Sequence, residues 1–429
     1  MKTNAIHRVP ADVINPVPTR RIQVPCDVLV LDARLRQSLV TVRSLGSRGL
    51  HVAALETAND APAFTSRWCQ EGHVCPVTEE TEAYLAYLEQ LLDSSRARVL
   101  ISSSDGTIAL IRLHRKRLEQ RVRIALAKET ALSIAINKEQ TLAIAERLGM
   151  GVPRGVLVCS VHEVAEAVRE IGLPAVVKPA ESWLWGQQHG ARYVSQLVTT
   201  PDEARLAVEE LTASGGTTLF QQFLPGRREA LSFLYAKGKM HARFAQWAKR
   251  TEPPLGGQSV LRQSIAIPAD IGESAERLVR EIELEGYSEV EFRRDSAGKP
   301  YLMEINPRLS ASVEIAVRSG VDFPYLLYQW ANEDAIDTVE SYRIGNWMRY
   351  LKGDIMTTIE ALQQRGRPGV MPPAQAILGF WLSFFQPMGY DYLDWSDLGP
   401  AFRATADFMQ SWIGGAVIKR FLQVKRRFS

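Results

Sequence analysis

The sequence predicts an α/β protein that opens with a Rossmann-like parallel sheet and continues into an α+β region. Two observations lead to this class. From Asp27 to Ala127, short apolar runs alternate with helical patterns, which is typical of a parallel sheet covered by helices. Further along, strand-like runs follow one another through short turns, as in TLFQQFL and the hairpin-like segment after it.

Composition limits the function classes. A length of 429 residues predicts two to four domains, and 46% hydrophobic with 23% charged residues is typical of a globular protein. The formal charge of +3 provides no reason to expect a nucleic-acid partner. The 4 cysteines lack the CxxC spacing of a zinc or redox site, so we expect a cytoplasmic, reducing environment.

The first block contains strand-like runs near 28–31, 51–55, 98–102 and 122–126, with helices near 36–48 and 80–94 and from 106. Residues 1–24 contain several prolines and no apolar run of a secretory signal, so we expect a flexible extension there. The stretch SSSDGT ends the third strand, where an open α/β sheet places a ligand crevice. Capping of the next helix by Ser104 or Asp105 is the favoured alternative.

A second block begins with a capping box, because Gln140 follows Asn137 at the required spacing. Lys138 then lies in the first helical turn, where the helix dipole disfavours a cation by a few tenths of a kcal/mol. It is either functional or merely tolerated. The run LPAVVKP predicts a strand with Lys178 at its end, and Gly186 and Gly190 bracket a loop that could cover a phosphate.

The segment SEVEFRRDSAGKPYLMEINPR predicts a hairpin. A turn centred between Ala297 and Gly298 pairs residues whose numbers sum to 595. Glu291 then lies opposite Glu304, and Glu289 opposite Asn306. Two carboxylates about 5 Å apart repel by about 3 kcal/mol at an effective dielectric constant near 20, so a cation is needed. Oxygen ligands on one face suit Mg²⁺, and a solvent-exposed polar face is the alternative.

Taken in order, these motifs resemble the ATP-grasp superfamily, particularly its carboxylate-amine ligases and carbamoyl-phosphate-synthase-like domains. The resemblance covers residues 130 to 330 and rests on Lys138, VVKP, the glycine loop, FQQFLPG with Glu229, VEF and MEINPR. It implies a two-lobed ATP-grasp fold after the first domain. Beyond residue 330 the resemblance thins, and patterns such as TTIEALQQRG predict a helical C-terminal extension. The implied segments are 1–24 (extension), 25–130 (pre-ATP-grasp domain), 131–205 (small lobe), 206–330 (large lobe) and 331–429 (extension of unassigned role).

The resemblance also assigns roles to single residues. Lys138 and Lys178 would hold the phosphates of ATP, and the amides from Gly186 to Gly190 would close over them. The adenine-binding segment would be Gln221, Gln222, Phe223 and Leu224, with Glu229 on the ribose. One or two Mg²⁺ ions, with Mn²⁺ as a substitute, would be held by Glu291, Glu304 and Asn306. Arg308 would stabilise the transferred phosphoryl group, whereas Arg262 would pair either with a substrate carboxylate or with a surface acid.

The implied activity is an ATP-dependent ligation of a small-molecule carboxylate to an amine through an acyl phosphate. A carboxylase or carbamoyl-phosphate-type reaction is one alternative. A non-catalytic nucleotide-binding scaffold is another, favoured by the unusual loop with Trp183, Trp185 and His189. A homodimer is a further expectation.

Residues 368–390 form an uncharged run whose prolines leave too few helical residues to span a membrane, which takes about 20. The favoured interpretation is a buried helix followed by a solvated tail. Peripheral membrane contact is the alternative, because basic residues cluster at the end of the chain: Lys419, Arg420, Lys425, Arg426 and Arg427.

Overall fold

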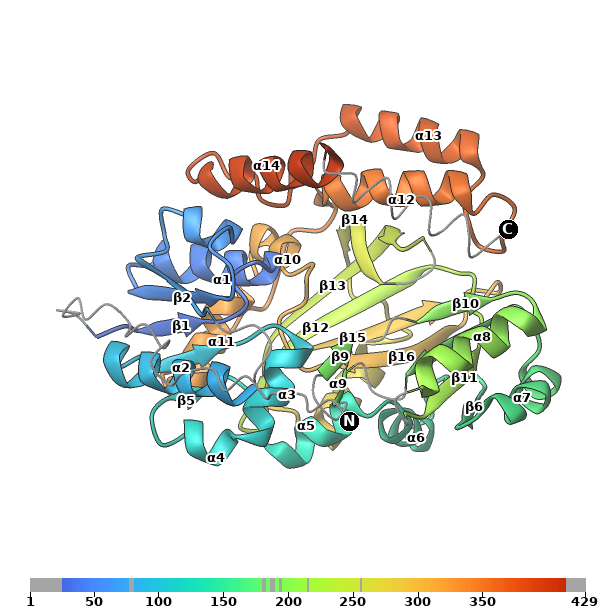
Figure 1. Cartoon of the computed structure of the whole chain (residues 1–429), viewed down its shortest axis with the longest axis horizontal. Coiled ribbons are helices and arrows are strands. Elements are labelled where there is room, and N and C mark those ends of the chain that lie inside the picture. The colour runs from blue at the N-terminus through green and yellow to red at the C-terminus, as the bar shows by residue number, and fades with distance from the viewer. Residues whose placement is uncertain are drawn as a thin grey trace, which may run out of the picture.

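The computed structural model describes residues 25–76, 81–179, 183–185, 190–192, 195–213, 216–254 and 257–413. Four sheets organise these residues (Figure 1). Residues 1–24, for which an extension is expected, and the basic cluster at 419–427 lie outside the described part.

The N-terminal domain is the predicted parallel sheet. Its strands are ordered β3-β2-β1-β4-β5, with bounds β1 Val28–Val30, β2 Val52–Glu56, β3 Glu71–Val74, β4 Val99–Ile101 and β5 Arg123–Ile124. The helices are α1 Arg36–Gly46, α2 Thr81–Ser95, α3 Asp105–Leu113 and α4 Arg115–Leu118, with the 3₁₀ turn η2 Pro62–Thr65. Alternate residues of β1 enter two separate cores, which explains the continuous apolar run of this strand. The edge strand β3 was not predicted because EGHV is a half-exposed, mostly polar sequence.

The next segment forms a small antiparallel lobe ordered β10-β7-β11-β6. Its strands are β6 Gly155–Val158, β7 Ala175–Pro179, β10 Gln196–Val198 and β11 Thr218–Gln222. Helices α7 Val164–Ile171 and α8 Pro201–Thr212 share a core with one face of this sheet, and η3 Val161–Glu163 leads into α7. Strands β8 Trp183–Trp185 and β9 Gly190–Arg192 pair with each other and lie against α3.

Two helices, α5 Glu129–Ile136 and α6 Lys138–Arg147, precede the small lobe. The predicted cap of α6 is confirmed, because the Asn137 side chain accepts a hydrogen bond from the Gln140 backbone N–H at 2.9 Å. Lys138 is therefore fixed at the start of α6.

The central sheet is ordered β16-β15-β12-β13-β14-β17-β18. Its first five strands in the chain are β12 Arg228–Ala236, β13 Lys239–Glu252, β14 Gln258–Ile265, β15 Gly286–Arg294 and β16 Pro300–Asn306. Helix α9 Gly272–Glu281 packs into one core with α5, α6 and this sheet. Helices α10 Glu314–Ser319 and α11 Phe323–Ala331 join the sheet to α1 and β1 in a single core, which fixes the N-terminal domain in place.

The C-terminal segment adds both strands and helices. Strands β17 Trp347–Arg349 and β18 Gly389–Tyr390 extend the central sheet, and the helical elements are α12 Leu351–Gln363, α13 Pro373–Leu382, η4 Ser383–Phe385 and α14 Gly399–Ile413. Figure 1 shows α12, α13 and α14 along one edge of the molecule, with α14 beside the N-terminal domain. The segment is thus partly built into the sheet.

The favoured interpretation of 368–390 as containing a buried helix is wrong. Only Ala376 of α13 is buried, whereas Leu378, Trp381 and Phe385 are among the exposed apolar side chains. The reason is that α13 packs mainly on α12 and meets the central sheet through Arg349 of β17, which donates to the Phe380 carbonyl at 3.1 Å, so most of its apolar surface stays uncovered. Among the described residues, no helix combines the length and the apolar character needed to cross a bilayer.

Candidate active site

The hairpin of β15 and β16 brings the predicted carboxylates together. Glu291 lies opposite Glu304, and Glu289 opposite Asn306, as the sequence predicted. Nearer the turn the pairing shifts, because Arg294 faces Pro300 and the residue numbers there sum to 594. The turn therefore centres on Ala297, and a β-bulge after Glu291 restores the predicted register. Bulges of this kind re-aim side chains beside functional sites.

Cations offset the repulsion between the two glutamates, as expected. Arg228, on the neighbouring strand β12, places Nη2 2.5 Å from Oε2 of Glu291. The Asn306 side chain donates to Oε1 of Glu291 at 3.1 Å. Lys138 Nζ lies 3.7 Å from Oε2 of Glu304. The role of Arg228 was missed in the sequence, because nothing in the pattern RRE indicates which arginine faces the hairpin.

The three carboxyl groups of the site differ in their pKa shifts, because burial and neighbouring charges act on each to a different extent. Burial, and then Glu291, raise the pKa of Glu289 to about 7. Burial also raises the pKa of Glu291, with Glu304 contributing while Arg228 opposes the shift. For Glu304, burial acts in the same direction, but Lys138 and Lys178 outweigh it and lower the pKa. Carboxyl groups held in this way favour the arrival of a cation.

Lys178, on the facing lobe, is also affected by burial. Burial lowers the pKa of Lys178 to about 8, and the nearby charge of Lys138 contributes to the shift. Lys178 lies opposite Leu219 on β11, and Gln221 lies opposite Val176 on β7. Because opposed residues share a face, Lys178 and Gln221 project from the same face of the small lobe. A buried pair of lysines is suited to an anion such as a phosphate chain.

A cavity of about 240 Å³ between the small lobe and the central sheet gathers most of the predicted residues. The predicted residues that line it are Lys138, Lys178, Gln221, Gln222, Phe223, Leu224, Glu291, Glu304, Asn306 and Arg308. Both amide atoms of the fully buried Gln221 lack a hydrogen-bond partner among the described residues. A polar ligand that enters the cavity can provide the hydrogen bonds that this amide lacks within the protein.

Arg308 connects this cavity to the N-terminal domain. Its guanidinium binds both carboxylate oxygens of Asp105, with Nη2 3.0 Å from Oδ2. The favoured reading of SSSDGT as a helix cap is wrong: Ser104 makes no side-chain cap bond to α3, and Asp105 pairs with Arg308 instead. The stretch supplies a residue of the site, as the crevice alternative predicted.

Two predicted residues are not brought to the cavity. Glu229 lies opposite Phe292 in the sheet and therefore on the face away from Glu291, where it pairs with Arg227 and Arg294. Its assignment to a ribose needs correction. The alternation of strand side chains places it in this ion cluster.

Arg262 is likewise misassigned, because it is 0% exposed and its Nη2 lies 2.5 Å from Oδ1 of Asp391. It can meet neither a substrate directly nor a surface acid. Its carboxylate partner is 129 residues away in sequence, so no local pattern could reveal the pair. Gly186 lies outside the described residues, and Gly190 begins β9.

The oxygen ligands fit a magnesium ion. Nowhere in the described ranges do three or more His, Cys, Asp or Glu residues gather as a ready metal cluster. The set here is the two glutamates, Glu291 and Glu304, plus the amide of Asn306, all on one face of the hairpin. Mg²⁺ is commonly held by one or two carboxylates while it keeps water and substrate phosphates as further ligands.

Comparison with known proteins supports this geometry. Residues 218–351 match the family model described as "ATP-grasp in the biosynthetic pathway with Ter operon". The chain is similar to the carbamoyl phosphate synthase large chain of Thermus thermophilus, with 28% identity over 258 residues, which cover 55% of this chain and 24% of that protein. The chain thus spans about a quarter of that relative.

Two further similarities involve proteins of more comparable length. A D-alanine–D-alanine ligase of Acidovorax ebreus is 26% identical over 230 residues, covering 49% of this chain and 66% of the ligase. The crystal structure of an L-amino acid ligase from Bacillus licheniformis superposes with a TM-score of 0.60 at 16% identity, covering 77% of this chain and 80% of the other, and shows a shared fold. The resemblance inferred from the motifs is confirmed by the match of residues 218–351 to an ATP-grasp family model.

Proposed function

We propose that the protein is an ATP- and Mg²⁺-dependent ligase that joins a carboxylate to an amine and releases ADP and phosphate. The observation that carries this proposal is the single cavity lined by two lysines, two paired glutamates, an asparagine and Arg308. These groups come from both lobes and from the MEINPR hairpin. The similarity to a D-alanine–D-alanine ligase supports the same reaction class.

The side chains divide the work of phosphoryl transfer. Lys138 and Lys178 bind the phosphates of ATP and neutralise part of their charge. Glu291, Glu304 and Asn306 would hold Mg²⁺, which would neutralise charge on the phosphates and on the transferring group. Arg308 would stabilise the negative charge that develops as the acceptor carboxylate attacks the γ-phosphoryl group.

No nucleophilic side chain is required. The substrate carboxylate attacks the γ-phosphorus, ADP leaves, and an acyl phosphate forms. The amine then attacks the acyl carbon, phosphate leaves, and the nitrogen gives up a proton. Positioning and electrostatic stabilisation supply most of the acceleration in such transfers, and exclusion of water protects the mixed anhydride.

A carbamoyl-phosphate-type or carboxylase reaction is a second candidate, favoured by the similarity to carbamoyl phosphate synthase. The same lysines and glutamates would serve it, with bicarbonate as the attacking acid. ATP turnover that depends on bicarbonate and on no other acid would identify this reaction. A non-catalytic nucleotide-binding scaffold is the remaining alternative, and it would bind nucleotide in this cavity without releasing ADP in response to any acid and amine.

The test is an ADP-release screen of the purified protein against pools of amino acids, small acids and amines, followed by mass analysis of the product. We expect Mg²⁺-dependent ADP release with at least one acid and amine together. Glu304→Ala should abolish this release while leaving the thermal unfolding temperature near that of the wild type. Glu340→Ala, at an exposed position outside the cavities, is the matched control. Unchanged turnover in Glu304→Ala would refute the proposed metal role.

The expected homodimer and the peripheral membrane contact stay predictions. The exposed apolar side chains of α13 are compatible with such a contact, and the basic cluster invoked for it lies outside the described residues.

A further inference from the structure

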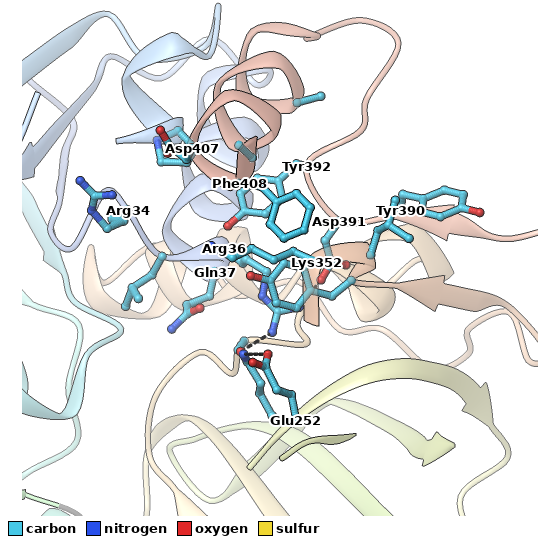
Figure 2. A pocket seen from close by; sticks show the side chains of 18 of the residues that line it. Arg34, Arg36, Gln37, Glu252, Lys352, Tyr390, Asp391, Tyr392, Asp407 and Phe408 are labelled. Atoms are coloured by element: carbon cyan, nitrogen blue, oxygen red, sulfur yellow. Dashed lines mark hydrogen bonds and ion pairs between the residues drawn. The ribbon is translucent and has the colours of Figure 1, made fainter. Parts of the chain in front are cut away.

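A second and much larger cavity, of about 980 Å³, adjoins the nucleotide cavity. It lies between the N-terminal domain, the central sheet and the C-terminal segment (Figure 2). The two cavities share Arg308, Gly257, Gln258 and Ala311 as wall residues. The volume is at the upper end for small-molecule sites and far exceeds the needs of bicarbonate or glycine.

The apolar wall of this cavity comes mainly from the C-terminal segment. The aromatic residues of the wall are Tyr350, Phe384, Tyr390, Tyr392 and Phe408. Figure 2 shows Tyr392 and Phe408 on the C-terminal side, across from Arg36 and Gln37 of the N-terminal domain. Phe384 is 44% exposed, so the apolar wall continues to the protein surface. Such a wall selects a ligand with an apolar body.

The polar floor of the cavity is built around Arg36 and Asp391, which line it, while Arg262 is fully buried behind the wall. Arg36 and Arg262 both bind the buried carboxylate of Asp391, so two cations share one anion. Arg36 also stacks on the Tyr350 ring at 4.0 Å and donates to Gln258 at 2.8 Å, which fixes its position.

Most of the acids at the wall already have cationic partners. Asp105 is bound by Arg308, and Asp407 by Arg403. Glu252 accepts a hydrogen bond from Gln258 at 3.1 Å. Lys352 is exposed at the wall and forms no ion pair with a described residue. The charged side chains of the wall are equal in number, but Lys352 and the two arginines on Asp391 leave cationic groups that favour an anionic end group on the ligand.

The position of Arg308 relates the ligand to the chemistry. Arg308 belongs to the walls of both cavities, so a carboxylate beside it faces the nucleotide, while the rest of the molecule extends toward α12 and α14. An amine without a carboxylate would be repelled by Arg308 and Lys352 at the wall. This inference rests on the ligase function proposed above and narrows its substrate class.

We propose that this cavity binds the carboxylic-acid substrate, that this acid carries an apolar body at least the size of an aromatic ring, and that the C-terminal segment selects it. The segment thereby acts as the specificity element of the enzyme. Burial of one phenyl group predicts about 30-fold tighter binding than for the same acid without the ring.

The experiment compares three probes by saturation-transfer NMR titration of the full chain in the presence of MgADP. They are 3-phenylpropionate, propionate and 2-phenylethylamine, which separate the contribution of the ring from that of the charge. We expect 3-phenylpropionate to bind about 30-fold more tightly than propionate. We also expect it to bind at least about tenfold more tightly than 2-phenylethylamine, because Arg308 and Lys352 attract its carboxylate and repel the ammonium group.

Two matched variants of α14 locate the binding site. Ala404 lines the cavity, whereas Ala406, two residues further along the same helix, is exposed and outside it. Ala404→Trp should weaken 3-phenylpropionate at least about tenfold by filling the cavity, and Ala406→Trp should leave its affinity unchanged. MgADP affinity should be equal in both variants.

The outcomes separate this inference from the proposed function. Equal or undetectable binding of the acids, tighter binding of the amine, or an Ala404→Trp variant that still binds 3-phenylpropionate would overturn the inference while MgADP binding stands. If the wild-type protein does not bind MgADP, that result would instead overturn the ligase proposal.

Discussion

The guanidinium of Arg308 binds the carboxylate of Asp105 at the point where three cavities meet. One is the proposed nucleotide cavity, one is the large aromatic cavity, and the third, of about 650 Å³, lies between α3 and the start of α6. Asp105 comes from the N-terminal domain and Arg308 from the end of the MEINPR hairpin. This pair positions the arginine through a contact between domains.

Arg308→Lys is predicted to lower kcat by about 100-fold, because a lysine cannot reproduce the planar fork that meets a transferring phosphoryl group. Asp105→Asn should lower kcat by a smaller factor, about tenfold, since Arg308 remains but loses its orientation. The measurement is ADP release with the acid and amine identified by the screen. Arg98→Lys, at an exposed ion pair of the N-terminal domain, is the control. Full activity of Arg308→Lys would contradict the assigned role.

Lys178 predicts a pH dependence of nucleotide binding. Its pKa lies at about 8 because of burial and the neighbouring Lys138, so the ligand-free protein loses this positive charge as pH rises through that value. Bound phosphates favour the protonated form. The affinity for ADP should therefore fall with pH above 8, by up to about tenfold per pH unit. Calorimetric titrations across this range check the slope, and Lys178→Met should bind weakly with a flat profile. A wild-type affinity that is independent of pH would argue against contact between Lys178 and phosphate.

We predict that replacing the side-chain amide of Gln221 has opposite effects on the stability of the protein and on its affinity for the nucleotide. Its side-chain amide is buried and has no hydrogen-bond partner among the described residues, which costs about 1–3 kcal/mol in the empty protein. Gln221→Met should therefore raise the unfolding temperature without ligand and weaken ATP binding. Gln196→Met, at a surface amide bonded to Glu210, is the control and should change neither quantity. A variant that loses stability and binds ATP normally would show that the amide has only a structural role.

We predict that acid weakens the attachment of the C-terminal segment, because Asp391 of this segment pairs with Arg36 of the N-terminal domain and Arg262 of the central sheet. Burial opposes its ionisation, but Arg262 and Arg36 outweigh burial and lower its pKa below the usual value. A lowered folded-state pKa contributes stability that is present above the unfolded pKa, about 3.9, and is lost as pH falls through the folded value.

Asp391→Asn should cost about 3–5 kcal/mol at neutral pH, because two buried guanidinium groups lose their shared anion. The difference in unfolding temperature between wild type and variant should shrink on acidification below about pH 4. Asp334→Asn, at an exposed site, serves as the control. A constant difference down to low pH would contradict the linkage.

The predictions from sequence succeeded where chemistry depends on local spacing. The two-residue period of strands and a tight turn were enough to place Glu291 opposite Glu304. The capping box of α6 was also predicted, because both partners lie within one helical turn. The predicted centre of the turn was nevertheless half a residue away from its position in the structure. The bulge after Glu291 cancels this error at the Glu291–Glu304 pair, and no sequence pattern indicated the bulge.

The predictions failed where partners are distant in sequence. Arg262 pairs with Asp391, and Arg308 pairs with Asp105. The partners lie 129 and 203 residues apart in the sequence, and the periodicity of helices and strands gives no information over such distances. Glu229 was misplaced because a motif fixes its number but not the face of the strand that carries it. The exposure of α13 follows from packing on α12, which its apolar sequence alone did not reveal.

The most direct test of the account is a Mn²⁺ titration in the presence of ADP, followed by electron paramagnetic resonance of the free ion. If the hairpin glutamates hold a divalent ion beside the nucleotide, Glu291→Gln and Glu304→Gln should each weaken Mn²⁺ binding at least about tenfold, while Glu340→Gln binds like the wild type. Equal binding of Mn²⁺ by all four proteins, or none by the wild type, would contradict a metal-bound nucleotide at this site.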